Sequence, residues 1–124
     1  MSTRSQVYLA DSGVYLYQHM DGYMLPEIVQ AALIQKERWD DEEYLNRIIF
    51  CEMVQDHIHD STGYGIGTQR HGDIEWLVTV NVERQTVKIE QGYDEDMKVL
   101  YENSFEDFIK TNVSEEKLLE VVQE

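Results

Sequence analysis

The sequence contains few of the residues that cross-link, kink or anchor a chain. Its 124 residues include one cysteine, Cys51, and one proline, Pro26. A single cysteine excludes a disulfide within the chain and fits a reducing compartment. No apolar run approaches the roughly 18 residues that a membrane-spanning helix needs, and residues 1–4 lack the apolar stretch of a signal peptide. We therefore expect a cytoplasmic protein with no membrane association.

Positive charge is also scarce. There are 10 Lys and Arg against 25 Asp and Glu, which gives a formal net charge of −15. Such a surface repels nucleic acid and anionic lipid, and this argues against direct binding of either. An acidic surface favours a basic partner, although it can also serve only to keep a protein in solution.

Length and composition predict one domain over residues 1–124. A chain of this size buries roughly two thirds of the surface that its unfolded form exposes, so it needs no metal or disulfide to fold. The sequence shows no linker, repeat or low-complexity segment, and its apolar fraction of 42% is ordinary for a globular protein.

The first part of the chain predicts a hairpin followed by two helices. Residues 6–10 and 14–18 are rich in strand-forming residues, and the turn 11–13 contains a glycine. Pro26 suits the first turn of a helix over residues 25–38. The acidic residues around Asp41 cap a second helix over residues 41–58.

The second part of the chain changes to period two. Residues 74–82 and 86–90 alternate between apolar and polar side chains; residues 64–69 and 97–101 predict further strands. Ser104 and Ser114 cap two short C-terminal helices, which we expect to pack peripherally.

Because strands and helices come in blocks, we predict an α+β fold: an antiparallel sheet of four to five strands with the two central helices on one face and short C-terminal helices. The expected core consists of the apolar residues on the inward face of each element: Val7, Leu9, Leu16, Val29, Leu33, Leu45, Ile48, Ile49, Trp76, Val78, Val80 and Ile89.

Three motifs resemble functional sites, namely a phosphate-binding loop, a metal site and a reactive cysteine, but each lacks a feature that such a site requires. The glycine-rich run over residues 63–67 lacks the Lys-Ser/Thr and the following helix of a phosphate loop, so it predicts a bent strand or a close approach of another group. The acidic and histidine residues over 56–60 are metal-ligand types, but His57 and His59 point apart on a helix, and we predict no metal and no cofactor. Cys51 lies among apolar residues and is expected to be buried rather than reactive.

The strongest constellation lies at the open end of the predicted hairpin. The start of the first strand lies beside the end of the second, so Arg4, Ser5, His19 and Asp21 should be neighbours. Tyr17 shares a strand face with His19 because the two are separated by two positions. Such a group can hold an anion, perform proton transfer, or simply lock the hairpin with an ion pair. The candidate binding residues are Arg4, Ser5, Tyr17, His19, Asp21, Tyr23, Gly65 and His71.

The N-terminal motifs resemble a known family. Residues 3–5 (Thr-Arg-Ser) and 17–23 (Tyr-Gln-His-Met-Asp-Gly-Tyr) are similar to those of small uncharacterised proteins of bacteriophages, prophages and bacteria. That family usually has Trp and Pro where this chain has Met20 and Met24. The resemblance covers only about the first 24 residues, and it implies a phage or prophage context rather than a mechanism.

Three functions remain open from sequence. The first is a non-enzymatic interaction domain, of phage or prophage type, that binds a basic surface of a host protein. The second is a domain that binds a small anionic ligand, or a modest enzyme, using Arg4, His19 and Asp21. The third is a homo-oligomeric structural protein, because a short chain with edge strands often covers them by self-association.

Overall fold

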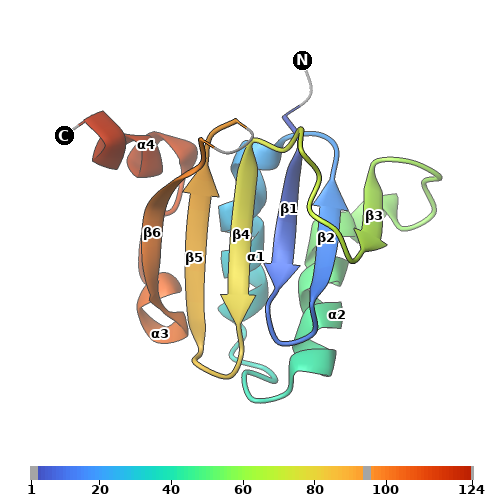
Figure 1. Cartoon of the computed structure of the whole chain (residues 1–124). Coiled ribbons are helices and arrows are strands. Elements are labelled where there is room, and N and C mark those ends of the chain that lie inside the picture. Colours follow the sequence, from blue (N-terminus) through green and yellow to red (C-terminus); the bar gives the residue numbers. More distant parts are fainter. Residues whose placement is uncertain (1–2, 94–95, 124) are drawn as a thin grey trace.

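Six strands form one sheet. The computed structural model describes residues 3–93 and 96–123 of the chain (Figure 1). The strand order is β3-β2-β1-β4-β5-β6. The helices α1 and α2 lie against one face of this sheet, and α3 and α4 lie near its β6 edge (Figure 1). The elements are β1 (Ser5–Leu9), β2 (Val14–Gln18), the 3-10 turn η1 (Gly22–Met24), α1 (Leu25–Leu33), α2 (Glu42–Val54), the 3-10 turn η2 (Gln55–His57), β3 (Tyr64–Gly67), β4 (Trp76–Asn81), β5 (Thr86–Gln91), β6 (Lys98–Ser104), α3 (Phe105–Phe108) and α4 (Glu115–Gln123).

The α+β class is confirmed, but the prediction of an antiparallel sheet of four to five strands is wrong in two respects. The sheet has six strands, and β1 pairs with β4 in parallel, with Val7 opposite Val78. The antiparallel hairpin of β1 and β2 is as expected. The β2 strand pairs with β1 on one side and with β3 on the other, and β4 pairs with the remaining side of β1. The chain enters β4 at the end of the sheet where β1 begins, so the two strands run the same way.

A carboxylate connects the two turns at the opposite end of this parallel pair. Asp11, in the β1–β2 turn, accepts hydrogen bonds from the backbone N–H groups of Val82 (2.6 Å) and Glu83 (3.1 Å) in the β4–β5 turn. The N–H of Ala10 donates to the carbonyl of Val80 at 3.0 Å. These bonds to backbone N–H groups fix the register of β1 against β4 at the end where both strands leave the sheet.

The core lies between the sheet and the two central helices. Period-two alternation places Val7, Leu16, Val78 and Ile89 in one cross-strand row, and all four are buried. The core prediction is confirmed for every residue named except Ile48, which is only partly buried.

Both central helices end earlier than the predictions of 38 and 58. Beyond α1, Lys36 and Arg38 adopt positive φ values of 55° and 61°, and Gln55 adopts 38° at the end of α2. A residue with positive φ cannot continue a right-handed helix. The expectation for Cys51 is wrong as well, because this residue is exposed. The buried stripe of α2 contains Leu45, Ile49 and Met53, at helical spacing, and Cys51 falls off that stripe.

The C-terminal helices lie at the β6 edge of the sheet, as expected (Figure 1), but they also contribute buried side chains to the core. Ser104 caps α3, its Oγ accepting from the N–H of Asp107 at 3.2 Å. Phe105 and Phe108 are fully buried, and Leu118 of α4 is 3% exposed. These side chains extend the core beyond β5, so the short helices complete it. No helix in the described part of the chain is long and apolar enough to cross a membrane.

The turn after β2 depends on a close approach that only glycine permits. A Cβ on Gly22 would lie 2.7 Å from the carbonyl oxygen of Thr3 and 2.8 Å from the Cβ of Ser5. The N–H of Gly22 donates to that same carbonyl at 2.8 Å. The preceding Asp21 has a φ of 57°, a value that aspartate tolerates better than most residues. The Asp-Gly pair thus has a structural role in leading the chain from β2 into η1.

We predict that Gly22→Ala lowers the free energy of unfolding by about 1–3 kcal/mol, because the added methyl group must displace backbone and Ser5. Urea denaturation of the purified protein measures this change. Gly67→Ala is the control, since a Cβ there meets nothing within 4 Å. If both substitutions lower the free energy of unfolding equally, the close packing at Gly22 does not contribute to stability.

Candidate functional site

The start of β1 and the end of β2 bring together part of the predicted constellation. The Arg4 Nε–H donates to His19 Nδ1 at 3.4 Å, and the hydroxyl of Tyr17 lies 3.0 Å from the same nitrogen. Because arginine cannot accept a hydrogen bond, His19 Nδ1 is the acceptor and the ring carries its proton on Nε2 in this arrangement. The expected proximity of Arg4 to His19 is therefore observed.

The same cluster includes two residues from the loop between β3 and β4. Asp73 forms an ion pair with Arg4 at 3.1 Å, and the ring of His71 stacks on Tyr17 with centroids 4.5 Å apart. Sequence reasoning included His71 but not Asp73. Nothing in the local sequence indicates Asp73, because its position beside Arg4 depends on the parallel pairing of β1 with β4. The charge of Arg4 is thus already balanced by a carboxylate of this chain.

The β3–β4 loop is held against the sheet by Gln6 of β1. The Gln6 side chain is 1% exposed. Its amide nitrogen donates to the carbonyl of Gln69 at 3.2 Å, and its oxygen accepts from the N–H of His71 at 2.9 Å. The nitrogen and the oxygen of this buried amide therefore both form hydrogen bonds with the backbone of the loop that contains His71 and Asp73.

The other candidate residues take different positions, and Gly65 lies directly beside this cluster. Gly65 of β3 pairs with Tyr17, and a Cβ added there would lie 3.9 Å from the Cβ of Tyr17. Tyr23 packs in part against the core. Ser5 is fully buried, and its hydroxyl has no hydrogen-bond partner among the described residues. Asp21 is exposed and lines a cleft, so the predicted group divides between two places.

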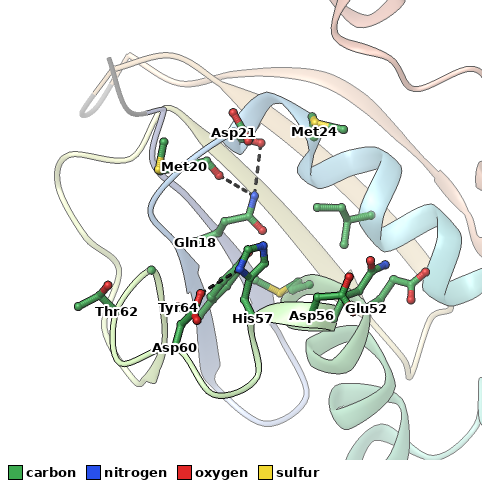
Figure 2. A pocket seen from close by; sticks show the side chains of 14 residues that line it. Gln18, Met20, Asp21, Met24, Glu52, Asp56, His57, Asp60, Thr62 and Tyr64 are labelled. Atoms are coloured by element: carbon green, nitrogen blue, oxygen red, sulfur yellow. Dashed lines mark hydrogen bonds and ion pairs between the residues drawn. The ribbon is translucent and has the colours of Figure 1, made fainter.

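The cleft that Asp21 lines has a volume of about 540 Å³. It lies between the end of β2 and η1 on one side and the end of α2 with the segment leading to β3 on the other (Figure 2). Carboxylates come from three of these segments, and no lysine or arginine is found among the described residues that line the cleft. The carboxylate-bearing residues are Asp21, Glu52, Asp56 and Asp60.

Apolar side chains also line the cleft. Three methionines, Met20, Met24 and Met53, line the cleft together with Ile28. Methionine is flexible and polarizable, and it suits binding surfaces that adapt to their ligand. The outer part of this lining is open to solvent, because the exposed fractions of Met20 and Met24 are 59% and 41%.

The amide of Gln18 is the most buried polar group in the cleft. Gln18 is 4% exposed, and its nitrogen donates to the carbonyls of Met20 (2.8 Å) and Asp21 (3.3 Å). Two carbonyl acceptors fix which end of the amide is nitrogen. The oxygen then has no hydrogen-bond partner among the described residues. Figure 2 shows Gln18 extending between Asp21 and His57.

Two residues of the cleft interact with each other at its far side. His57 Nδ1 lies 2.9 Å from an oxygen of Asp60. The ring of His57 also lies near that of Tyr64, with centroids 6.0 Å apart. Burial raises the pKa of Tyr64, and the carboxylates of Asp60 and Asp21 raise this pKa further. Within residues 3–93 and 96–123, no three His, Cys, Asp or Glu side chains form a group that could hold a metal ion.

A second groove, of about 440 Å³, runs along the outer side of α2. It contains Arg38, whose guanidinium lies 4.5 Å from the ring centroid of Tyr44, and Arg47, which lies 3.7 Å from the sulfur of Cys51. This groove mixes both signs of charge, in contrast to the acidic cleft. Cys51 therefore lies in an open, partly cationic setting rather than in the core.

No protein family model, curated protein or solved structure matches this chain.

We predict that Gln6→Met releases the β3–β4 loop, because methionine fills a similar volume but cannot bond to Gln69 or His71. The free energy of unfolding should fall by about 1–2 kcal/mol, and the His71 amide should exchange with deuterium faster. Hydrogen-exchange NMR and urea denaturation measure the two effects. The matched control is Gln69→Met, which alters an exposed side chain. Unchanged exchange at His71 in Gln6→Met would contradict the prediction.

We also predict that Asp60→Asn lowers the pKa of Tyr64 towards its ordinary value of 10.0 without reaching it, since burial is the larger cause of the shift. The raised pKa means that folding favours the neutral phenol. Its contribution to stability is complete below pH 10.0 and is lost as the pH rises through the folded-state pKa. Carbon-13 NMR titration of the tyrosine rings measures this change, with Tyr17 as the internal reference. A Tyr64 pKa identical in both proteins would exclude the influence of Asp60.

Proposed function

We propose that this chain is a non-enzymatic protein-interaction domain that binds a basic surface of a partner protein at the acidic cleft. The observation that carries the proposal is the composition of the cleft: the described residues that line it include four that bear carboxylates and no lysine or arginine. Neighbouring carboxylates repel one another, and a cationic ligand relieves this repulsion. The net charge of −15 also draws a basic partner to the surface and accelerates association.

The polar and apolar composition of the cleft favours a protein ligand. Its solvent-exposed methionines supply apolar contact next to the carboxylates, a mixture typical of the edge of a protein interface. Copies of this chain carry the same large negative charge and repel each other, which favours a different protein over self-association. The resemblance to phage and prophage proteins supports a host protein as the partner.

The alternative of an anionic-ligand site or a modest enzyme has less support. It requires Arg4, His19 and Asp21 to act together, whereas Arg4 pairs with Asp73 and Asp21 lines the cleft. An anion at Arg4 would have to displace Asp73. Arg4, Tyr17 and His19 line neither of the two cavities described above.

We predict that a capped hexalysine peptide binds to the cleft and that Glu52→Gln/Asp56→Asn weakens this binding at least about tenfold. Both residues line the cleft, and neither forms an ion pair among the described residues. Titration at 0.05 and 0.15 M salt, followed by nitrogen-15 NMR, gives the affinity and the residues affected. Raising the salt should weaken binding.

Glu83→Gln/Glu102→Gln is the matched control. It removes the same two negative charges from exposed positions in the β4–β5 turn and on β6, away from the residues that line the cleft. The proposal expects this variant to bind nearly as well as the unchanged chain. Equal weakening by the two double variants would show that the peptide responds only to net charge, and the cleft would then not be the binding site.

A further inference from the structure

The buried amide oxygen of Gln18 gives the cleft an unpaired hydrogen-bond acceptor in addition to its carboxylates. The other end of this amide is bonded to the carbonyls of Met20 and Asp21, so the side chain cannot rotate to satisfy its oxygen without losing both bonds. The oxygen has no hydrogen-bond partner in the described part of the chain. A buried acceptor without a donor destabilises a protein, and a ligand that carries a donor into the cleft removes this cost.

We propose that the cleft receives the ammonium group of a single lysine side chain from the partner, and that Gln18 Oε1 accepts a hydrogen bond from that group. This inference rests on the proposed function and specifies its ligand. The surrounding carboxylates of Asp21, Glu52 and Asp56 supply the compensating negative charge. A charged donor forms stronger hydrogen bonds than a neutral one.

The arrangement of acceptors favours an ammonium over a guanidinium group. Gln18 lies on β2, Asp21 lies just before η1, and Asp56 lies in η2, so the acceptors reach the cleft from separate segments (Figure 2). An ammonium group has three donors on one rotatable nitrogen and can meet acceptors that come from different directions. A guanidinium group instead suits two oxygens of one carboxylate in a plane.

The apolar part of the lining suits the lysine stem. Met24, Ile28 and Met53 can cover a chain of four methylene groups while the charged end lies among the carboxylates. A quaternary ammonium group is a different ligand, because it is usually held by the faces of several aromatic rings. Among the described residues that line this cleft, the aromatic groups are Tyr64 and His57. A trimethylated nitrogen also has no hydrogen to donate to Gln18 Oε1.

The test uses the full chain and capped pentapeptides of sequence Gly-Ala-Xaa-Ala-Gly, in which Xaa is lysine, trimethyllysine, norleucine or arginine. NMR titrations follow the Gln18 side-chain amide and the methionine methyl groups. We expect the lysine peptide to shift the signals of Gln18 and Met53, and to bind at least about tenfold more tightly than the trimethyllysine and norleucine peptides. The arginine peptide should bind more weakly than the lysine peptide.

A substitution gives a second, independent measurement. Gln18→Met keeps the volume but removes the acceptor, so it should abolish the preference for lysine over trimethyllysine. Its folding is checked by urea denaturation. The substitution also removes the two hydrogen bonds from Gln18 to the carbonyls of Met20 and Asp21. If the variant does not fold, the comparison of peptides on the unchanged chain tests the proposal by itself.

The outcomes separate this inference from the proposed function. If lysine and trimethyllysine peptides bind equally and both are weakened by Glu52→Gln/Asp56→Asn, the basic-partner function stands and the role of Gln18 is refuted. If that double variant affects no basic peptide, both proposals fail. Tighter binding of free 1,5-diaminopentane than of the lysine peptide would identify a small amine as the ligand and would overturn the assignment to a partner's side chain.

Discussion

The parallel pairing of β1 with β4 determines which residues meet in this protein. It joins two segments that are about 70 positions apart and places both strands in the middle of the sheet. With β4 on one side of β1 and β2 on the other, β3 joins the sheet on the outer side of β2. The end of β2 and the segment that follows α2 are therefore brought together, and the cleft forms between them.

The same pairing explains the cluster on the other face of the sheet. The loop that leads into β4 must return to the end where β1 begins, and the carbonyl of Arg4 accepts from the N–H of Glu75 at 2.8 Å. This return places Asp73 in an ion pair with Arg4 and stacks the ring of His71 on that of Tyr17. The cluster is a structural consequence of the topology, with Gln6 holding the loop in place.

Local patterns predicted most of the elements but not how the strands pair. The hairpin, the alternation of residues 74–82 and the caps at Ser104 and Ser114 follow from short-range chemistry, and each is found in the structure. The partner of β1 is chosen by packing over the whole sheet, which no local window contains. For this reason the sheet was expected to be antiparallel.

The candidate site was predicted in part, for a similar reason. The proximity of Arg4 to His19 follows from the hairpin alone. Alternation along β2, however, sends Tyr17 to the face opposite the helices and Gln18 to the helix-covered face, since Gln18 pairs with Ser5 and Tyr17 with Gln6. The left-handed Asp21 then turns the chain towards the helices. A motif that is continuous in sequence is thus divided between two faces of the sheet. The acidic cleft could not be predicted from sequence, because it also depends on where α2 packs.

The exposure of Cys51 has a practical consequence for studying the chain in solution. It is the only thiol in the sequence and is accessible, so a maleimide dye or a nitroxide spin label can be attached at one defined position. The neighbouring residue, Glu52, borders both the acidic cleft and the groove along α2. A single reporter at this site lies within range of either cavity without any engineering of the sequence.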